Sequence, residues 1–408
     1  MKKVTFIHAA DLHLDSPMIG LKNLPERIFK KLQESTFEAL GKIVDAAIIH
    51  QVNFVILAGD LFDGEDRSIR AQARLRKEME RLEARNIAVF AVHGNHDHLE
   101  GVWTHLPLPK NVQLFSHEVE ALKYTKEDGT SVHLYGFSYP KRHLFTRMVP
   151  FYVKEEGADF HIGILHGHIE GSSEHAKYAP FTLKELLHKE FDYWALGHIH
   201  KRQDLSTLPP VVYPGNIQGR HRKETGMKGC YLVHLSEAGC IRNFIATSVV
   251  IWDEKELDAS NLNSFHDIYT MCKNIIEEKR AEKIGTILSL TIKNVNIPEQ
   301  DYKAVVNGEL LDVLQEEEKE EEHFVWISKL SAVESKKWWS REQLEKDSAF
   351  YSELFKIASN KDELNKSIVS LYNHPVARRF LEDLPADEKN KLAIEAEELL
   401  VSLLNLRE

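Results

Sequence analysis

Short apolar runs alternate with longer mixed stretches through the first 250 residues of the chain. Runs of this length are typical of buried strands, and we expect strands at residues 4–7, 54–58, 88–93, 162–166, 193–196 and 211–213. Between the second and third of these, residues 68–85 space their apolar side chains mostly at helical intervals. Alternation of strand, helix and strand predicts an α/β fold. Residues 231–250 indicate a β-hairpin that turns at 237–239.

The pattern changes after residue 250, where a polar stretch precedes an expected helix at 265–283. Strands at 286–292 and 324–330, with a helix at 301–314 between them, predict a small α/β subdomain. The acidic run at 316–322 is typical of a solvated loop or helix end. From 341 onward the pattern is helical. We therefore expect a catalytic domain at 1–250, a small α/β subdomain at 251–340 and a helical region at 341–408.

The last helical segment has a near-heptad apolar stripe. Its members step by four, three, four and three residues: Leu392, Ala396, Leu399, Leu403 and Leu406, widened by Leu400 and Leu404. Packing onto its own domain is the more common role of such a stripe. Docking to a partner helix or a coiled coil is the alternative.

Composition restricts the class of protein further. The chain has 408 residues, 43% of them apolar and 28% charged, which is typical of a globular protein of two or three domains. No run approaches the ~20 apolar residues that a membrane span needs. The apolar run at 4–7 is too short for a signal peptide. The three cysteines match no zinc, redox or disulfide pattern, so we expect a cytoplasmic protein that does not contact a membrane.

The net charge of −11 is distributed unevenly along the chain. Residues 1–250 hold 31 Lys and Arg against 30 Asp and Glu, and the remainder holds 21 against 33. Acidic residues of the first part would moreover be neutralised if they bound metal. The overall acidity is therefore compatible with an anionic substrate at the first part.

Carboxylates, an amide and imidazoles follow five of the expected strands. The segments are Asp11-Leu12-His13, Gly59-Asp60-Leu61-Phe62-Asp63, Gly94-Asn95-His96-Asp97, His166-Gly167-His168 and Gly197-His198-Ile199-His200. Sites in open α/β sheets lie beyond the carboxyl ends of the strands, so residues distant in sequence should converge. Each motif alone is more often a turn or a satisfied polar pair, but five in succession after strands favour a functional site.

The residue types indicate the chemistry. Mixed Asp, His and Asn ligands suit Mn²⁺, Fe²⁺ or Zn²⁺. The ligands are more numerous than one ion needs, and two ions about 3.5–4 Å apart with one bridging carboxylate would use them all. The sequence therefore predicts a two-metal hydrolase that acts on a phosphate ester.

The order D-x-H, G-D-x-x-D, G-N-H-D, H-G and G-H-x-H resembles the calcineurin-like metallophosphoesterase superfamily. The stretches FIHAADLHLDSP, ILAGDLFD and VHGNHD resemble its SbcD-type DNA repair exonuclease branch, and within that branch the YhaO-like proteins. The superfamily motifs cover residues 11–200, and the branch resemblance continues through 213–216. It implies a β-sandwich flanked by helices in four α/β/β/α layers, with a small α/β capping subdomain and a helical C-terminal region.

The resemblance also implies roles for individual residues. One metal would take Asp11, His13, Asp60 and His200, and the second would take Asp60, Asn95, His166 and His198, with Asp60 as the bridge. His96 would position the phosphodiester or protonate its leaving oxygen, and Asp97 would orient the His96 ring. We expect His166 rather than His168 as the ligand, because it directly follows the strand. Three nearby histidines are expected to be structural: His8, His93 and His98.

The substrate is less tightly defined, because the superfamily hydrolyses many phosphoesters. Basic residues follow three functional segments and form an expected rim for a DNA backbone: Lys141, Arg142, Arg147, Lys201, Arg202, Arg220, Arg222 and Lys223. Scattered solvated cations are the alternative interpretation. The resemblance implies a Mn²⁺-dependent DNA exonuclease, with endonuclease activity on single strands as an extension. It also implies a homodimer that works with an SbcC-like coiled-coil ABC-type ATPase. Two alternatives remain: an enzyme for small nucleotide or lipid-linked phosphoesters, and a scaffold without catalysis.

Overall fold

A computed structural model describes residues 1–18, 24–64, 67–101, 104–171, 178–319, 322–334, 341–358 and 386–405, with 366 and 369 besides. The chain forms two compact units. The larger one combines Met1–Ile292 with Ile297–Ala332, and the smaller one combines Lys293–Asn296 with Val333–Glu408. Among the described residues, every helix is too short or too polar to cross a membrane.

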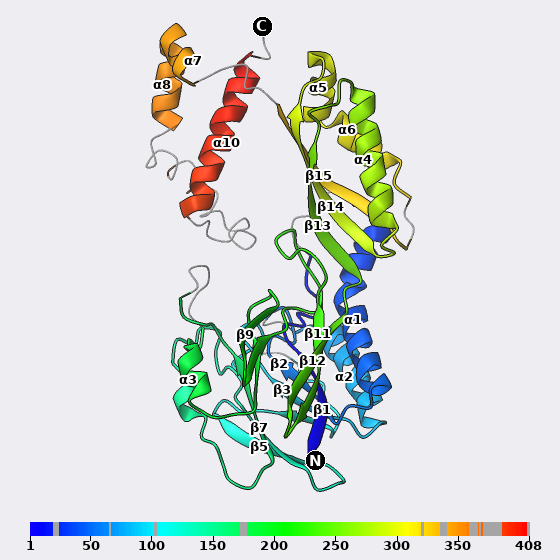
Figure 1. The fold of residues 1–408 in the computed structure, drawn as a ribbon, viewed down its shortest axis with the longest axis vertical. Helices are drawn as coiled ribbons and strands as arrows, with labels where there is room; N and C mark the ends of the chain where they lie inside the picture. Colours follow the sequence, from blue (N-terminus) through cyan, green and yellow to red (C-terminus); the bar gives the residue numbers. More distant parts are fainter. Residues whose placement is uncertain are drawn as a thin grey trace. The chain divides into compact units, whose positions relative to one another are not determined.

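The first large sheet has six strands in the order β12-β11-β1-β2-β3-β4 (Figure 1). Their bounds are β1 Lys3–Ala9, β2 Phe54–Ala58, β3 Ala88–Val92, β4 Val112–Leu114, β11 Gly229–Ser236 and β12 Gly239–Ala246. Strands β1 to β4 run parallel, and the predicted hairpin of β11 and β12 adds antiparallel to β1. All five residues of β2 are buried, because a central parallel strand is covered on both faces.

The second large sheet also has six strands, in the order β5-β6-β7-β8-β10-β9. Their bounds are β5 Glu120–Thr125, β6 Ser131–Gly136, β7 Phe160–His166, β8 Tyr193–Gly197, β9 Gln203–Thr207 and β10 Pro210–Tyr213. The parallel strands β6, β7, β8 and β10 form its centre. The sequence pattern missed β5, β6 and β9. The edge strands β5 and β9 carry many polar residues and lack a clear apolar run, whereas β6 is a buried central strand.

Three layers of core hold the two sheets and their helices together. Alternate side chains of the first sheet pack on α1 (Glu26–Ile49) and α2 (Ile69–Glu83). The opposite face of that sheet packs on the second sheet through a core rich in aromatic residues. The outer face of the second sheet is covered by α3 (Leu183–Leu187) and the 3₁₀ turn η1 (Val149–Phe151). The predicted four-layer α/β/β/α arrangement is confirmed.

A third sheet belongs to the same unit as the two large ones. It has the order β13-β14-β15, with bounds β13 Val250–Asp258, β14 Gly285–Val295 and β15 Val325–Glu334. Its helices are α4 (Phe265–Arg280), α5 (Glu299–Val306) and α6 (Glu309–Glu316). The single helix expected at 301–314 is instead two helices. Gly308 separates them at φ 98°, a left-handed conformation that favours glycine and interrupts a helix.

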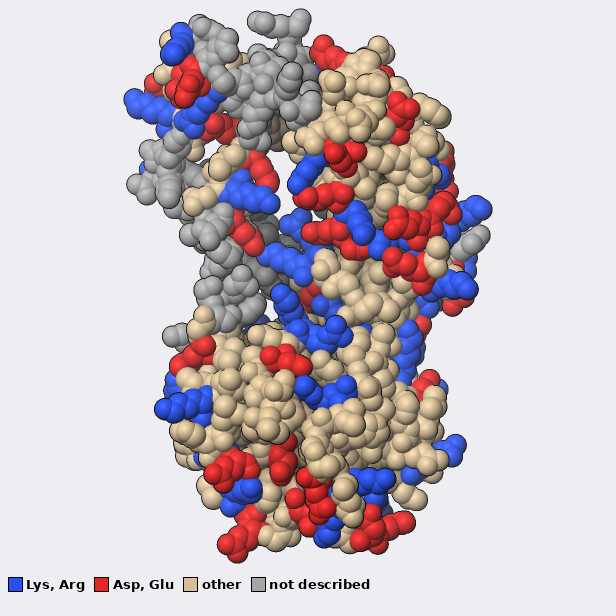
Figure 2. Space-filling view, viewed as in Figure 1, with Lys and Arg blue, Asp and Glu red and all other residues tan. Residues whose placement is uncertain are grey.

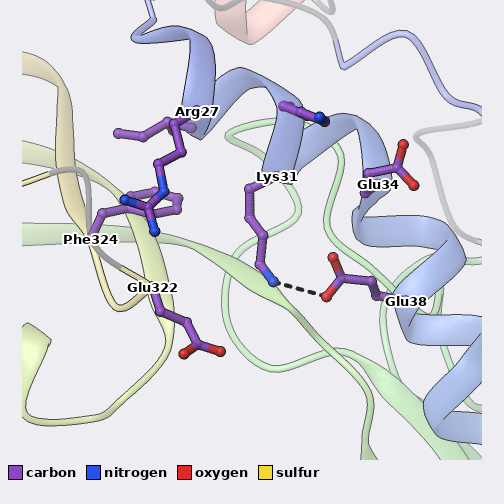
Figure 3. A pocket seen from close by; sticks show the side chains of 8 residues that line it. Arg27, Lys31, Glu34, Glu38, Glu322 and Phe324 are labelled. Atoms are coloured by element: carbon purple, nitrogen blue, oxygen red, sulfur yellow. Dashed lines mark hydrogen bonds and ion pairs between the residues drawn. The ribbon is translucent and has the colours of Figure 1, made fainter.

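Helix α1 also takes part in the core of the third sheet. Ile28 and Leu32, from its first half, pack with Trp252, Phe324 and other side chains of that sheet. Beside this contact lies a hollow of about 350 Å³ lined by Arg27, Lys31, Glu34, Glu38, Glu322 and neighbours (Figure 3). One acidic residue of the 316–322 run is not solvated as expected. Glu318 has a side chain 2% exposed and pairs with Arg280 at 2.8 Å.

The smaller unit is helical, as predicted, with α7 (Arg341–Asp347), α8 (Ala349–Ala358) and α10 (Ala386–Asn405) in the described part. Arg341 links the three helices, because its guanidinium lies 3.4 Å from Glu397 and stacks over the ring of Phe355. Of the predicted stripe, Leu406 lies outside the described residues. Four leucines of α10 are exposed: Leu392, Leu399, Leu400 and Leu404.

Candidate metal centre

The five polar segments meet where the two large sheets face each other. Asp11, Asp60 and Asn95 follow β1, β2 and β3 of the first sheet, while His166 ends β7 and His198 follows β8 of the second. Backbone bonds hold the loops in register, since Asp11 N donates to Gly59 O at 3.0 Å and His13 N donates to Asp60 O at 2.9 Å. Residues nearly two hundred positions apart therefore form one cluster.

The backbone at this cluster is strained. Asp11, His13, Asp60 and His198 have φ values of 52°, 42°, 50° and 98°, in the left-handed region that side chains other than glycine rarely adopt. Such residues persist only where the surrounding structure enforces them, and they gather at functional sites. The strain points to a site whose side chains are held for a purpose other than stability.

Two glycines explain why the motifs begin as they do. A Cβ atom at Gly94 would lie 2.2 Å from Asp60 Oδ1 and 2.7 Å from His166 Nε2. A Cβ atom at Gly59 would lie 2.2 Å from His166 Nδ1, and its φ of 91° is itself left-handed. Both positions require glycine because the backbone passes directly against the cluster.

One half of the cluster consists of Asp11, His13 and His200. The Nε2 atoms of His13 and His200 face each other at 3.1 Å. His200 Nε2 is 4.0 Å from Asp11 Oδ1, and His13 Nε2 is 3.7 Å from Asp60 Oδ2. These groups offer ligand atoms that lie close enough together to hold a single cation.

The other half consists of Asp60, Asn95, His166 and His198. His166 Nε2 is 3.3 Å from Asp60 Oδ2 and 3.1 Å from Asn95 Oδ1. His198 Nδ1 is also 3.1 Å from Asn95 Oδ1. The same oxygen of Asp60 thus faces both halves. His168 lies further out, with its ring 6.1 Å from that of His198.

Two histidines have their Nδ1 hydrogen-bonded to an acceptor, and His13 has a carboxylate oxygen close to its Nδ1. His200 Nδ1 is 2.6 Å from Glu224 Oε1, His166 Nδ1 is 3.0 Å from the Ala58 carbonyl, and His13 Nδ1 is 2.9 Å from Asp63 Oδ1. In the neutral ring an acceptor at Nδ1 places the proton there, and Nε2 then carries a lone pair. The Nε2 atoms of His13 and His200 face each other at 3.1 Å, and a cation at this point would accept a lone pair from each. The donor set fits divalent metal ions.

Charge at the cluster leads to the same conclusion. Burial raises the pKa of Asp11. Burial also raises the pKa of Asp60, but the neighbouring histidines, His166 foremost, outweigh it and hold the pKa well below its usual value. Burial lowers the pKa of His166, but Asp60 and Asp11 outweigh it and raise this pKa to about 9. A buried pair of carboxylates therefore favours added positive charge.

Two residues that the sequence did not single out complete this arrangement. Glu224 is 5% exposed, and besides His200 it accepts hydrogen bonds from Asn216 Nδ2 at 2.9 Å and Arg220 N at 2.7 Å. Asp63, quoted only as part of a motif, contacts His13. A carboxylate directly after the basic run at 220–223 was the available signal for Glu224.

Arg220 was expected on a solvated basic rim, and this expectation is wrong. Its side chain is 11% exposed and pairs with both Asp63 and Glu224, so it belongs to the support of the cluster. Arg147 is partly exposed, but it pairs with Glu185 at 2.7 Å. The other expected rim residues that are exposed are Lys141, Arg142, Lys201, Arg202, Arg222 and Lys223.

Asp97 does not orient His96, contrary to expectation. Its carboxylate accepts hydrogen bonds from the backbone N–H groups of Leu61 and Gly94, and lies 2.9 Å from His93 Nδ1. The His96 ring instead places Nδ1 3.2 Å from the carbonyl of Asp63. Asp97 is fully buried, so it fixes the loop that carries Asn95 and His96 without facing them.

The remaining histidines behave as structural residues. His8 is fully buried between the Tyr193 hydroxyl at 3.0 Å and the Leu196 carbonyl at 3.1 Å. Burial lowers the pKa of His8 to about 3, so it is neutral. His98 is buried beside the guanidinium of Arg67, which donates to its carbonyl at 2.9 Å.

The chain is similar to several known proteins. Residues 4–202 match the calcineurin-like phosphoesterase family. The chain is 40% identical over 401 residues to the uncharacterized metallophosphoesterase YhaO of Bacillus subtilis, covering 97% of each chain. It is 26% identical over 309 residues to the DNA double-strand break repair protein Mre11 of Saccharolobus solfataricus, covering 71% of this chain and 75% of that one. A dimetal phosphatase from Danio rerio overlaps 60% of this chain and 96% of its own, with a TM-score of 0.36 and 13% identity.

The fold and the cluster define a metallophosphoesterase. The chain belongs to the calcineurin-like metallophosphoesterase family, with Mre11-like nucleases among its more distant relatives. Members of this family use a dimetal centre, and the groups Asp11-His13-His200 and Asp11-Asp60-His166 are the matching candidates in this chain.

Proposed function

We propose that this protein hydrolyses phosphodiester bonds of DNA, as an exonuclease of the SbcD type, with two divalent ions that we expect to be Mn²⁺. The observation that carries the proposal is the meeting of five strand ends around one shared carboxylate, Asp60. One ion would bind Asp11, His13, Asp60 and His200. The other would bind Asp60, Asn95, His166 and His198.

When bound, the ions would polarise the phosphate and lower the pKa of a water molecule that serves as the nucleophile. Residues of the chain itself orient the metal ligands and protonate the leaving oxygen. Glu224 fixes the ring of His200 by holding a proton at Nδ1, and Asp63 lies 2.9 Å from His13 Nδ1. His96 donates from Nδ1 to the Asp63 carbonyl, so its Nε2 can give a proton to the leaving oxygen when both ring nitrogens are protonated. Asp97 contributes only by fixing the loop that carries Asn95 and His96.

DNA is favoured over a small phosphoester by two observations. The relatives named Mre11 are DNA double-strand break repair proteins, and one of them aligns with 71% of this chain. In addition, basic residues from three segments remain exposed, although the face shown in Figure 2 carries both Lys and Arg and Asp and Glu. Contacts to phosphates alone would give little sequence preference.

Degradation of linear DNA with Mn²⁺, compared with hydrolysis of a chromogenic phosphodiester, tests the proposal. We expect both activities, and we expect both to vanish in Asp60→Asn. Hydrolysis of the small ester without DNA degradation, even with an ATPase partner present, would favour the alternative of a small nucleotide or lipid-linked substrate. Normal cellular function of Asp60→Asn would indicate a scaffold.

We also propose that the protein forms a homodimer and binds a coiled-coil ABC-type ATPase of the SbcC kind through its C-terminal helices. The exposed leucines of α10 support this, because apolar rows on a helix need a partner surface. Size-exclusion chromatography with light scattering tests the dimer, and a monomer at micromolar concentration would contradict it.

A further inference from the structure

Three aromatic rings form a patch that the metal cluster does not use. His143, Phe145 and Tyr178 have nearly parallel ring planes, with angles of 16°, 17° and 19° between pairs. Their ring centroids are 5.7 to 6.2 Å apart. His143 is exposed and Phe145 is 64% exposed, whereas Leu144 between them is buried in the core of the second sheet. Leu144 thus anchors the segment while its two neighbours present their rings to solvent.

The patch is fixed in place by polar contacts. Ala179 N donates to Leu144 O at 2.7 Å, which joins the two segments side by side. The Tyr178 hydroxyl lies 3.1 Å from His143 Nδ1. The rings are therefore held in position in advance, and a flat ligand would not have to order them on binding.

The patch also adjoins the metal cluster. The Tyr178 ring contacts the His198 ring edge-on, with centroids 5.4 Å apart. His198 in turn faces Asn95 at 3.1 Å. A group that is separated by one sugar from a phosphate bound at the cluster could therefore reach these rings.

A large exposed aromatic surface beside an anion-binding site has a natural ligand. Every nucleobase has a π face that stacks on aromatic side chains, independent of its sequence. Lys141 and Arg142 precede the patch in sequence and are exposed, so a backbone phosphate would find cations beside the stacked base.

We propose that His143, Phe145 and Tyr178 form a nucleobase-stacking subsite that holds an unpaired base next to the scissile phosphodiester. This inference rests on the proposed DNA hydrolysis and specifies its substrate: a single strand or a frayed end, whose base has left the helical stack. Fully paired ends would have to unstack first and would react more slowly.

The test compares oligonucleotides whose terminal nucleotide either carries a base or is abasic. We expect the wild-type protein to have a KM about tenfold lower for the strand that carries the base. Phe145→Ala should raise KM for that strand by about the same factor, with kcat unchanged, and leave the abasic strand unaffected. Phe145→Trp should restore the preference. Phe151→Ala, which removes another exposed phenylalanine from the second-sheet side, is the matched control.

A binding measurement without added metal provides a readout independent of activity. An oligonucleotide with terminal 2-aminopurine should lose fluorescence on binding to the wild-type protein, because stacking quenches this base, and should keep it with Phe145→Ala. If KM for DNA hydrolysis is the same for the abasic strand and the strand that carries the base, and the same in wild type and Phe145→Ala, the stacking subsite is wrong and the nuclease function is unaffected. If the 2-aminopurine fluorescence is quenched but the protein degrades no DNA, the nuclease function is wrong and the stacking subsite stands. Weakened binding of a protein partner by Phe145→Ala, with unchanged quenching, would assign the patch to a protein interface.

Discussion

The strand-end cluster and the last helix invert the ordinary distribution of side chains in opposite ways. Asp11, His13, Asp60 and His166 are at most 1% exposed, although they are polar or charged. Leu399 of α10 is 59% exposed, although it is apolar. Burying charge without compensation is costly, and exposing a row of leucines forfeits the stabilisation that their burial would give.

The two regions therefore each indicate a missing binding partner, of different chemistry. Imidazole lone pairs and carboxylates crowded together favour cations, whose bonds are directional and fix the geometry within tenths of an ångström. Leucines on a helix favour another apolar surface, which imposes far looser requirements on identity and register. The first region therefore specifies the role of each residue, whereas the second specifies only the type of surface that would bind it.

The largest expected effect separates chemistry from coordination within the cluster. His96→Ala should lower kcat on linear DNA by about 10²–10⁴-fold, because it removes the proton donor. Metal content should remain unchanged, since the contact of residue 96 with Asp60 comes from its backbone N–H at 2.9 Å. Turnover and metal analysis of the same preparation check this, and a loss of bound metal would assign His96 to coordination instead.

A smaller effect is expected at the support of the ligands. Glu224→Gln keeps the shape of the side chain but removes the charge that holds the His200 proton and Arg220, so Mn²⁺ affinity should fall about 10–100-fold. Calorimetric titration with Mn²⁺ measures it. Glu80→Gln, at an exposed pair with Arg76, is the control. Equal affinities in the two variants would show that Glu224 does not support the site.

The third prediction concerns stability in acid. His8 has a pKa near 3 when folded and an ordinary value of 6.5 when unfolded, so the unfolded chain binds the extra proton between these values. This contribution to stability is complete above pH 6.5 and is lost as pH falls toward 3, at up to about 1.4 kcal/mol per pH unit. His8→Gln should therefore have a shallower fall of the thermal midpoint between pH 6.5 and 5. Metal-free samples avoid linkage to ion binding, and parallel curves would contradict the prediction.

The smallest effect on the metal cluster is expected from changes in helix α10. Deleting residues 386–408 should leave Mn²⁺ affinity and turnover of a small phosphodiester within about twofold, and should weaken capture of the ATPase partner. The substitution Leu399→Asp should reproduce the loss of capture in the full-length chain, whereas Glu395→Ala on the same helix should not. Undiminished capture by both the truncated protein and Leu399→Asp would remove α10 from the interface.

The sequence predicted the convergence of the cluster because strand ends and ligand types are local properties. Asp11, Asp60 and His166 each directly follow or end an apolar run, and parallel strands present such ends at one edge. Partners set by tertiary contact were less predictable. Asp97 pairs with His93 rather than His96, and Arg220 turns inward to two carboxylates, because the path of a loop decides both. The helix break at Gly308 was readable from composition, but a glycine inside a helical pattern does not always end it.

Helix α1 contributes to the cores of two sheets. Its first half contributes Ile28 and Leu32 to the third sheet, and its second half contributes Leu40 and Val44 to the first large sheet. Because α1 is one continuous 24-residue helix, a substitution in its first half changes the core of the third sheet and one in its second half changes the core under β2, the strand that ends before Asp60.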